Sequence, residues 1–378
     1  MTDEPKQEMV VTPWEVKGDI DYDKLIEQFG VSRLTPNIED KIAEHAGFKH
    51  LQLRRGVYLS HRDTDWWIKE YEKGNKVGLY TGRGPSGNVH LGHLVPWFFC
   101  AYLQKAFGAD MYFQMTDDEK FLHRSDLSLD EAVGFTYENA LDVIACGLER
   151  GKTHIFSDTE DIEHLYKIAL RVAKKVTYST AKAVFGLTDS DNIGKIWYPA
   201  MQAMTCFLES DREGRNIPCL IPAAIDQDPY WRMTRDIAEK LGYYKPAQIH
   251  AKFLPGLAEG GKMSASQPET AIFTTDPPKK AGKKVMKAFT GGRETVEMQR
   301  ELGGRPEICN VYAYFYFLFE DDDKALVDRE TACKKGEILC GHCKKELSGR
   351  VEVFLTDFQD KREKAREVLD EYLIKPVK

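Results

Sequence analysis

Between residues 75 and 272, short apolar runs alternate with longer segments whose apolar residues recur at helical spacing. The runs that predict strands are Val77–Tyr80, Met111–Met115, His154–Phe156, Cys219–Ile225 and Gln248–Phe253. The segments that predict helices lie near 90–107, 129–146, 160–176 and 229–241. Regular alternation of this kind is typical of an α/β protein with a doubly wound parallel sheet, which binds ligands at the carboxyl ends of its strands.

The chain on either side of this region shows a different pattern. Residues 1–74 read as an N-terminal appendage with a helix over Ile20–Phe29. From about residue 273 the pattern is helical to the end, which predicts an all-α C-terminal domain over 273–378. Within the α/β domain, residues 75–272, we expect a helical insertion at about 121–205.

Composition narrows the class of protein. Of the 378 residues, 42% are hydrophobic and 30% are charged, which is typical of a globular protein of two or three units. No apolar run is long enough to cross a membrane, and the first residues match neither a signal nor a transit peptide. We therefore expect a cytoplasmic protein without membrane contact, whose eight scattered cysteines stay reduced.

One group of cysteines has to be weighed as a metal site. Cys340-Gly-His-Cys343, with Cys333 upstream, is similar to a metal knuckle, but no second Cys or His pair accompanies it. The stretch Lys334–Leu347 also predicts one continuous helix. We therefore expect no structural metal.

A glycine-rich segment follows the first predicted strand and leads into a helix. It reads Thr81-Gly-Arg-Gly-Pro-Ser-Gly-Asn-Val-His90-Leu-Gly-His93. Its glycines let the backbone approach a ligand closely, and the N–H groups and dipole at a helix start favour anions. Arg83 adds a fixed charge, and the two histidines share one face of the first turn. Alone, the segment is compatible with a phosphate loop, with a plain turn or, less readily, with half of a zinc site.

A second segment, Gly261-Lys-Met-Ser-Ala-Ser266, follows the last predicted strand. Lys262 and the hydroxyls of Ser264 and Ser266 can follow a phosphate as its charge develops. A lysine in a glycine-rich loop is by itself usually only solvated. Because both segments follow predicted strands, they together indicate a site for the phosphates of ATP.

These two segments resemble the signatures of the class I aminoacyl-tRNA synthetases. His90-Leu-Gly-His93 is similar to the first signature, and Lys262-Met-Ser-Ala-Ser266 is similar to the second, in which Ala265 takes the place of the usual second lysine. Further segments resemble the eukaryotic cytosolic and archaeal tryptophanyl-tRNA synthetases, and the likeness extends from about residue 12 to the C-terminus. They are Pro13-Trp14, Ile20-Asp-Tyr-Asp-Lys-Leu25, Ser60-His-Arg-Asp63, Gln114-Met-Thr-Asp-Asp-Glu-Lys120, Phe185-Gly-Leu-Thr-Asp-Ser-Asp191, Ala224-Ile-Asp-Gln-Asp-Pro-Tyr230, Arg232-Met-Thr-Arg-Asp236 and Glu320-Asp-Asp-Asp-Lys324.

The resemblance implies a Rossmann-like nucleotide-binding sheet, a homodimer and a reaction in two steps. L-tryptophan would attack ATP, with Mg²⁺ bound, to give tryptophanyl-adenylate and pyrophosphate. The tryptophanyl group would then pass to the terminal adenosine of tRNA(Trp). Neither step needs a protein nucleophile, so catalysis would consist of alignment and charge stabilisation.

The resemblance also implies roles for single residues. The catalytic residues would be His90, His93, Lys120, Lys262 and Ser264. The remaining ATP-binding residues would be Arg83, Gly84, Gly92, Asp226 for the ribose, Met263 and Ser266. Tryptophan would contact Tyr80, Gln114, Glu119, Gln202 and Gln227. Because Tyr80 and Gln114 end neighbouring predicted strands, their side chains can converge on the indole N–H, while the other three are candidates for the α-ammonium group.

The partner of the C-terminal domain would be tRNA, although the net charge of the chain is −7. Five lysines form a strip after Asp276-Pro-Pro278, and we expect Lys283 and Lys284 among them to meet phosphate. Arg293 and Glu294, after Gly291-Gly292, resemble the family's anticodon-contacting turn.

Three other functions fit parts of the sequence. A tyrosyl-tRNA synthetase shares the fold and the chemistry, but it needs a carboxylate aimed at a phenol, which Asp117 or Asp118 could supply. A catalytically idle paralogue that binds RNA or signals to cells would not need His90, His93 and Lys262. A small-molecule nucleotidyltransferase would need neither the second signature nor the helical C-terminal domain.

Overall fold

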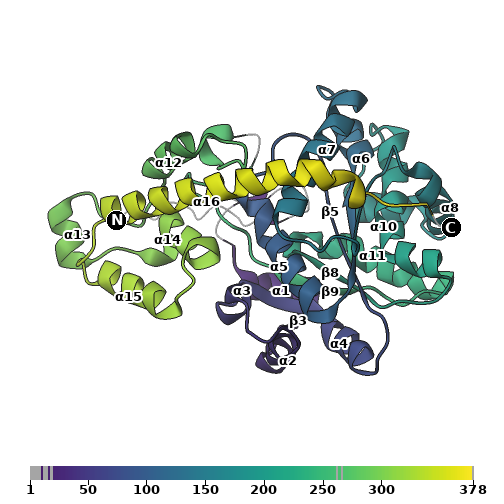
Figure 1. Ribbon diagram of the computed structural model, residues 1–378, viewed down its shortest axis with the longest axis horizontal. Helices are drawn as coiled ribbons and strands as arrows, with labels where there is room; N and C mark the ends of the chain where they lie inside the picture. Colours follow the sequence, from purple (N-terminus) through teal and green to yellow (C-terminus); the bar gives the residue numbers. More distant parts are fainter. Residues whose placement is uncertain (1–9, 12–15, 18–19, 261–262, 265–266, 377–378) are drawn as a thin grey trace.

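The computed structural model describes residues 10–11, 16–17, 20–260, 263–264 and 267–376. A seven-stranded sheet with the order β3-β4-β9-β8-β5-β6-β7 forms its centre (Figure 1). Its strands are β3 (Ser32–Arg33), β4 (Tyr58–Arg62), β5 (Gly78–Arg83), β6 (Asp110–Met115), β7 (Thr153–Ser157), β8 (Cys219–Ala224) and β9 (Ala247–Ala251). A separate antiparallel pair joins β1 (Val10–Val11) to β2 (Val16–Lys17).

The five strands predicted from the apolar runs are parallel neighbours. The chain builds β5, β6 and β7 in one direction and then returns to the other side of β5 to add β8 and β9. This order confirms the predicted doubly wound sheet and places the switch in strand order between β5 and β8. In such sheets a ligand crevice opens at the carboxyl ends of the strands beside this point.

The sheet begins earlier in the chain than residue 75. β3 and β4 come from the predicted N-terminal appendage and extend the sheet in antiparallel fashion beside β9. Ser60 of β4 lies opposite His250 of β9, and the Ser60 hydroxyl is 3.0 Å from His250 Nδ1. A polar residue of β4 is therefore satisfied by a partner on β9 inside the sheet, which is why no apolar run marks this strand.

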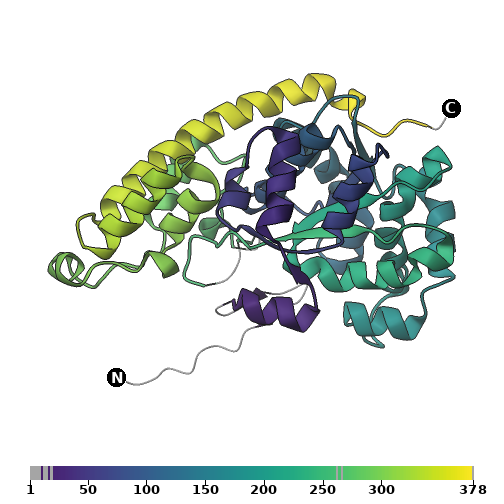
Figure 2. The same cartoon turned by 90° about the horizontal axis from the view of Figure 1, so that it is seen from below.

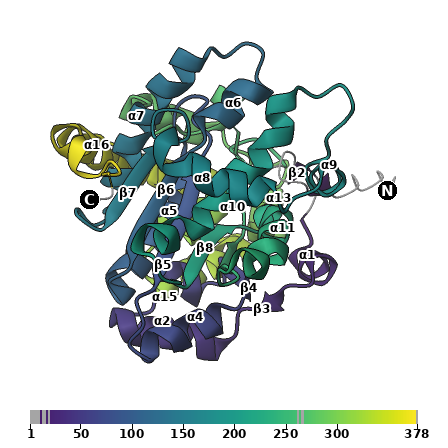
Figure 3. The ribbon, with the colours of Figure 1, turned by 90° about the vertical axis from the view of Figure 1, so that its right-hand side faces the viewer.

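Helices cover both faces of the sheet and form two cores with it. Along β5, Leu79 contributes to the first core and Tyr80 to the second, as the alternation of side chains in a strand requires. The first core includes α2 (Pro36–Ala46), α4 (Thr64–Glu72), α5 (Leu91–Phe107) and α7 (Leu129–Ala145). The second includes α8 (Ile162–Ala173), α9 (Tyr178–Phe185), α10 (Ile193–Glu213) and α11 (Asp228–Ala238). In Figure 3, α2 and α4 lie near β3 and β4, and α7 lies near β7 at the opposite sheet edge.

The range 121–205, expected as a helical insertion, also contains the sheet strand β7, so its helices are not one continuous insert. The shorter elements are α1 (Tyr22–Phe29), α3 (Leu51–Arg54), α6 (Asp117–His123), η1 (Ile225–Gln227), η2 (Glu239–Leu241), η3 (Pro268–Thr270), η4 (Pro306–Ile308) and η6 (Leu369–Glu371). No helix in the described part of the chain is long and apolar enough to span a membrane.

The C-terminal part is helical, as predicted. It consists of α12 (Pro278–Met286), α13 (Val296–Leu302), α14 (Asn310–Tyr314), the π-helical segment η5 (Phe315–Phe319), α15 (Asp323–Lys334) and α16 (Cys340–Val368). The single helix predicted over Lys334–Leu347 is wrong, because α15 ends at Lys334 and α16 begins at Cys340. Between them Gly336 has φ +72°, a left-handed conformation that ends a helix.

Helix α16 ties the C-terminal helices to the sheet. Its 29 residues span about 44 Å, and Figures 1 and 2 show it crossing from one half of the molecule to the other. On α16, Arg362 Nε lies 3.3 Å from Asp142 Oδ2 on α7. Beyond α16, Ile155 of β7 donates its N–H to Tyr372 O at 2.7 Å and accepts from Ile374 N at 2.8 Å. The chain end thus caps the β7 edge of the sheet.

Candidate active site

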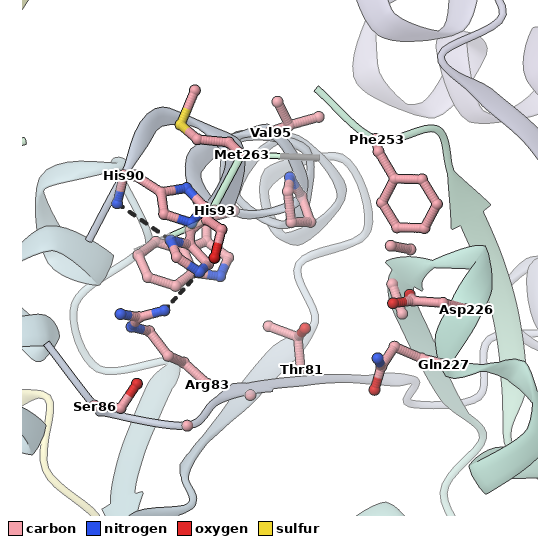
Figure 4. A pocket seen from close by; sticks show the side chains of 18 of the residues that line it. Thr81, Arg83, Ser86, His90, His93, Val95, Asp226, Gln227, Phe253 and Met263 are labelled. Carbon is pink, nitrogen blue, oxygen red and sulfur yellow. Dashed lines mark hydrogen bonds between the residues drawn. The ribbon is translucent and has the colours of Figure 1, made fainter. Parts of the chain in front are cut away.

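A cavity of about 1080 Å³ lies at the carboxyl ends of the central strands. The loops that follow β5, β8 and β9 and the start of α5 line it. Figure 4 shows His90, His93 and Arg83 on one side of the cavity and Asp226 and Gln227 on the other, with Thr81 of β5 between them. The cavity therefore occupies the switch point, where a doubly wound sheet binds ligands.

The two histidines of the first signature form the start of α5. His90 is the N-cap residue, and its backbone N–H donates to His93 Nδ1 at 3.2 Å. The two rings stack with their centroids 3.6 Å apart. His93 Nε2 lies 2.6 Å from Arg83 Nη1, so the imidazole pair and the guanidinium form one connected group at a helix N-terminus.

Arg83 is buried and also holds the glycine-rich loop. Its Nη2 donates to Gly87 O at 3.2 Å and to Asn88 O at 3.3 Å, and its Nε donates to Asn139 Oδ1 at 2.5 Å. Burial lowers the pKa of this guanidinium to about 10, although the nearby Asp142 carboxylate acts in the opposite direction. Arg83 thus shapes the loop as well as adding positive charge beside His93.

Two glycines of the signature lie close to neighbouring side chains. A β-carbon at Gly84 would overlap the Lys120 side chain. At Gly92 it would lie 3.1 Å from the His90 ring and 3.7 Å from Met263 Cβ. Gly92 therefore provides a flat surface between the two signatures, and a larger side chain there would narrow the cavity.

The described residues of the second signature meet the first, as predicted. Met263 is buried, and both Met263 and Ser264 line the cavity. The segment that follows is fixed to the start of α5, because Leu91 donates its N–H to Ile272 O at 3.0 Å and His90 forms a β-bridge with Phe273. Lys262 and Ser266 lie outside the described residues.

Tyr80 and Gln114 converge as predicted, although β5 continues past Tyr80 to Arg83, so Tyr80 does not end its strand. The Tyr80 hydroxyl donates to Gln114 Oε1 at 2.6 Å, and Gln114 Nε2 donates to both oxygens of Asp158 at 2.8 and 2.9 Å. Tyr80 lines the cavity, whereas Gln114 and Asp158 are fully buried behind it. The direction of this chain of hydrogen bonds leaves the Tyr80 hydroxyl oxygen as an acceptor for an N–H donor in the cavity.

The carboxylate behind Gln114 belongs to a buried pair. Burial, and then the neighbouring Asp118 carboxylate, raise the pKa of Asp158 well above its usual range. Burial likewise raises the pKa of Asp118 to about 7. Asp117 accepts hydrogen bonds from the hydroxyls of Ser157 and Thr159, both at 2.6 Å. None of these three aspartates lines the cavity formed by the described residues, so none is placed to meet a phenol.

Three residues expected to contact the α-ammonium group of tryptophan, Glu119, Gln202 and Gln227, line the cavity. Glu119 Oε2 accepts from Thr116 Oγ1 at 2.8 Å, and Glu119 Oε1 accepts from Lys120 Nζ at 2.9 Å. Gln202 is buried, and its Oε1 has no hydrogen-bond partner among the described residues. A buried acceptor left in this state is favourable only when a bound donor satisfies it.

The expectation that Lys284 meets tRNA phosphate is wrong. Its side chain is only 4% exposed, and Nζ donates to Asp276 Oδ2 at 2.6 Å and to Ala271 O at 2.9 Å. Lys284 lines the cavity, together with Lys280 one helical turn before it. Lys283 is exposed on another face of α12, where phosphate can reach it. Helical spacing divides the lysine strip into an inner and an outer face.

Sequence reasoning missed further residues of the cavity. An aromatic wall comprises Tyr198, Tyr230, Trp231 and Phe253. These four residues come from separate elements of the chain, so only the folded structure shows that they line one cavity. Asp158 was missed for a similar reason, since it follows β7 and meets Gln114 only across the sheet.

Arg293 and Glu294 lie at a second cavity, of about 720 Å³, among the C-terminal helices. Arg293 Nε donates to Gly303 O at 2.8 Å, and its backbone N–H donates to Gln299 Oε1 at 2.9 Å. Glu294 is exposed. The turn is therefore fixed through Arg293 and presents Glu294 to solvent.

Comparison with known families gives one match over most of the chain. Residues 72–356 match the family model of the class I tRNA synthetases for tryptophan and tyrosine. This range contains the whole of the cavity described above and the turn at Arg293.

Individual proteins match over nearly the full length. The tryptophan–tRNA ligase of Pyrobaculum calidifontis is 50% identical over 97% of this chain and 98% of its own length. That of Thermococcus sibiricus is 52% identical over 97% of this chain and 94% of its own. The crystal structure of Plasmodium falciparum tryptophanyl-tRNA synthetase has a TM-score of 0.87 and 40% identity, covering 93% of this chain and 97% of that one.

Proposed function

This chain belongs to the class I tRNA synthetases for tryptophan and tyrosine, and we propose that it is a tryptophan–tRNA ligase. The observation that carries the proposal is the joining of both signatures in one cavity whose wall presents the Tyr80 hydroxyl, backed by Gln114. The closely similar relatives are named tryptophan–tRNA ligases. The placement of Asp117 and Asp118 outside the cavity disfavours tyrosine as the substrate.

The reaction has two steps. A carboxylate oxygen of tryptophan attacks the α-phosphorus of ATP, and the bond from this phosphorus to the bridging oxygen breaks, which releases pyrophosphate. The 2′-hydroxyl of the terminal adenosine of tRNA(Trp) then attacks the carbonyl carbon of the adenylate, and AMP leaves. Both steps pass through crowded, negatively charged centres, so a site that aligns reactants and stabilises charge is sufficient.

On the phosphate side, His90 and His93 at the start of α5 contact the triphosphate. Arg83 holds His93 and the loop that carries Gly84. Lys120, Lys262, Ser264 and Ser266 complete the phosphate contacts. Lys280 and Lys284 line the same cavity and add positive charge that the second signature lacks at Ala265.

On the nucleoside side, the flat surface at Gly92 and the backbone of Met263 take the adenine. Asp226, on η1 directly after β8, takes the ribose hydroxyls. Met263 and Asp226 lie on opposite sides of the cavity in Figure 4. ATP would therefore lie across the ends of β5 and β8, with its α-phosphorus near the tryptophan pocket.

Tryptophan fills the inner end of the cavity. Its indole N–H donates to the Tyr80 hydroxyl, which Gln114 orients, and its ring packs against the aromatic wall. Glu119, Gln202 and Gln227 receive the α-ammonium group. Because Lys120 already pairs with Glu119, arrival of the ammonium group frees Lys120 to turn toward phosphate.

Magnesium is proposed as the companion of ATP. Mg²⁺ in such sites binds chiefly to substrate phosphates and water, with few protein ligands. The cavity suits this mode, because its described lining offers several cations and only Glu119, Asp226 and Asp276 as carboxylates. The bound ion would neutralise charge on the departing pyrophosphate.

Each part of the chain has its own proposed role. We assign ATP and tryptophan to the α/β domain at 75–272 and the anticodon to the helical domain at 273–378, with 1–74 as an appendage that adds two sheet strands. Arg293 and Glu294 would read bases, and Lys283 would hold phosphate. The enzyme would act as a homodimer in the cytoplasm, where protein synthesis consumes its product.

Charging of tRNA tests the proposal. The purified chain, ATP and radiolabelled tryptophan are incubated with tRNA(Trp) transcripts and with transcripts whose anticodon is changed. We expect an alkali-labile tryptophanyl ester on tRNA(Trp) and little on the changed transcripts. Tyrosine in place of tryptophan is the control, and efficient charging with tyrosine would contradict the assignment.

A further inference from the structure

Arg62, the last residue of β4, forms a buried ion pair close to the nucleoside side of the cavity. Its Nε donates to Asp228 Oδ1 at 2.6 Å, and its Nη2 donates to Asp228 Oδ2 at 2.8 Å. Asp228 is the first residue of α11, and its side chain is fully buried. A bidentate arginine–carboxylate pair of this kind fixes the relative orientation of two elements as well as their distance.

The same guanidinium also ends helix α1. Its Nη1 donates to Gly30 O at 3.1 Å, and its Nη2 donates to Phe29 O at 2.6 Å. Gly30 is the C-cap of α1, with φ +62°. The last carbonyl groups of a helix have no partner within it, so a cation at this place satisfies them and complements the helix dipole. Arg62 therefore joins the end of α1 to the start of α11.

A second basic side chain lies near Asp228 but is uncharged at neutral pH. His250 Nε2 is 3.7 Å from Asp228 Oδ1. Burial lowers the pKa of His250 to about 4. The positive charge that meets the buried carboxylate therefore comes from Arg62. Removal of that charge alone would leave Asp228 ionised and buried, which a protein tolerates poorly.

Asp228 follows Asp226 and Gln227 directly in the chain. These two residues belong to η1, a single 3₁₀ turn between β8 and α11. Figure 4 shows them along one wall of the cavity, with Phe253 on the same side. Because so short a 3₁₀ turn has weak hydrogen bonds of its own, its orientation depends on what holds its two ends. One end continues from β8, and the ion pair with Arg62 holds the other.

Helix α1 packs against the same turn. Ile225, the first residue of η1, is fully buried in a small core with Leu25 and Ile26 of α1. At the start of α1, the Tyr22 hydroxyl accepts a hydrogen bond from Phe253 N at 3.0 Å, and Phe253 lines the cavity. Helix α1 is therefore fixed to the nucleoside wall at its start through Tyr22 and at its end through Arg62.

From these contacts we propose that Arg62 is a positioning residue for the ribose-binding carboxylate of Asp226, and that it acts through Asp228. The guanidinium sets the angle between η1 and α11, and with it the direction of the Asp226 side chain. Neither Arg62 nor Asp228 is among the described residues that line the cavity, so their effect reaches the nucleotide only through η1. The role of Asp226 rests on the proposed function, whereas the contacts of Arg62 do not.

Discrimination at the ribose tests this role. Tryptophan-dependent pyrophosphate exchange is measured with ATP, 2′-deoxy-ATP and 3′-deoxy-ATP for the parent, Arg62→Gln and Arg62→Lys. The readout is the ratio of kcat/KM for ATP to that for the deoxy analogue that the parent uses less well. A displaced Asp226 no longer favours the ribose hydroxyls, so we expect this ratio to fall by about tenfold in Arg62→Gln. Arg62→Lys keeps the charge but not the bidentate contact and should give an intermediate ratio.

A matched control pair joins the same parts of the chain. Arg235 on α11 donates from Nη2 to Asp63 Oδ2 at 2.5 Å, and Asp63 directly follows β4. Arg235 lies about two helical turns after Asp228, away from η1. Arg235→Gln therefore removes an ion pair between β4 and α11 but should leave the ribose ratio at the parent value. An equal fall in Arg235→Gln and Arg62→Gln would reduce Arg62 to a general structural role and overturn the proposal.

Two further measurements keep the test decisive. If Arg62→Gln folds poorly, the double variant Arg62→Gln with Asp228→Asn removes both buried charges and keeps a donor opposite an acceptor. It should regain stability in urea unfolding, while its ribose ratio stays below that of the parent.

Equilibrium dialysis with ATP and the two deoxy analogues measures ribose discrimination without the exchange reaction. Absence of exchange in the parent would therefore contradict the proposed function alone, and dialysis would still test Arg62. A parent-like dialysis ratio in both Arg62→Gln and the double variant would overturn the role of Arg62. So would a parent protein that binds ATP and both analogues equally.

Discussion

The Tyr80 hydroxyl donates a 2.6 Å hydrogen bond to Gln114 Oε1, and this relationship determines what the inner cavity can recognise. Because the hydroxyl proton points to Gln114, its oxygen faces a ligand as an acceptor. Gln114 in turn is oriented by Asp158, to which its amide nitrogen donates. A ligand with an N–H group at this place extends the chain, and one without it forgoes this hydrogen bond.

Replacing Gln114 by Ala should weaken the preference for the indole N–H. The Tyr80 hydroxyl then loses its acceptor and can donate toward the ligand instead. We expect the ratio of kcat/KM for tryptophan to that for its benzothienyl analogue, in which sulfur replaces the ring N–H, to fall by about tenfold or more. Tyr112→Phe, on the same strand as Gln114 but outside the cavity lining, is the control. An unchanged ratio in Gln114→Ala would place the contact elsewhere.

Asp158 should act as a positioning residue through Gln114. Asp158→Asn keeps an oxygen that accepts from Gln114 Nε2, whereas Asp158→Ala leaves the amide free to rotate. We therefore expect the same ratio of specificity constants to drop in Asp158→Ala and to recover largely in Asp158→Asn. Equal ratios in these two variants would show that Asp158 has only a structural role.

Neighbouring lysines of α12 should behave differently. Lys283→Ala should reduce the slope of log K for tRNA against log salt by about 0.7, because one exposed phosphate contact is lost. Lys284→Ala should instead destabilise the fold, by up to about 3 kcal/mol, because the buried Asp276 loses its nearest cation and keeps only Lys280 at 3.9 Å. Urea unfolding measures the second effect, and the double variant with Asp276→Ala should recover part of it. Equal effects of Lys283→Ala and Lys284→Ala on the salt slope would contradict the separation of the two faces.

The free energy of unfolding should decrease as the pH is lowered, because of His250. Burial lowers the pKa of His250 to about 4, the Asp228 carboxylate opposes this, and Arg62 and His61 add to it. The unfolded chain therefore binds a proton between about pH 6.5 and 4 that the folded chain does not, so the free energy of unfolding decreases as the pH falls through this window. His250→Gln should flatten this slope in urea titrations, while substitution of the exposed His342 should not. The same slope in His250→Gln as in the parent would contradict the assignment.

The parallel sheet and the signatures were predictable because local pattern encodes them. Val77–Tyr80 and the other apolar runs are buried on both faces, as central parallel strands are. The loops after them carry glycines and charges at the strand ends, where the fold places ligands. Tyr80 and Gln114 lie on the neighbouring strands β5 and β6, although β5 continues past its predicted end at Tyr80 to Arg83.

The features that sequence missed depend on distant partners. β4 carries Ser60 and His61, whose polar groups are satisfied only by β9 and the start of α4. In the sequence, Lys284 resembles an exposed lysine of a helix. In the structure, the side chain is buried and pairs with Asp276.

The most direct test of the central claim is pyrophosphate exchange into ATP, measured with each standard amino acid in turn. This reaction needs the adenylate site but no tRNA, so it isolates the cavity at the ends of β5 and β8. We predict exchange that requires tryptophan and Mg²⁺ and is negligible with the other amino acids. Exchange driven by tyrosine would contradict the claim in favour of the sister enzyme. Exchange with no amino acid at all would contradict it in favour of an idle paralogue or another nucleotidyltransferase.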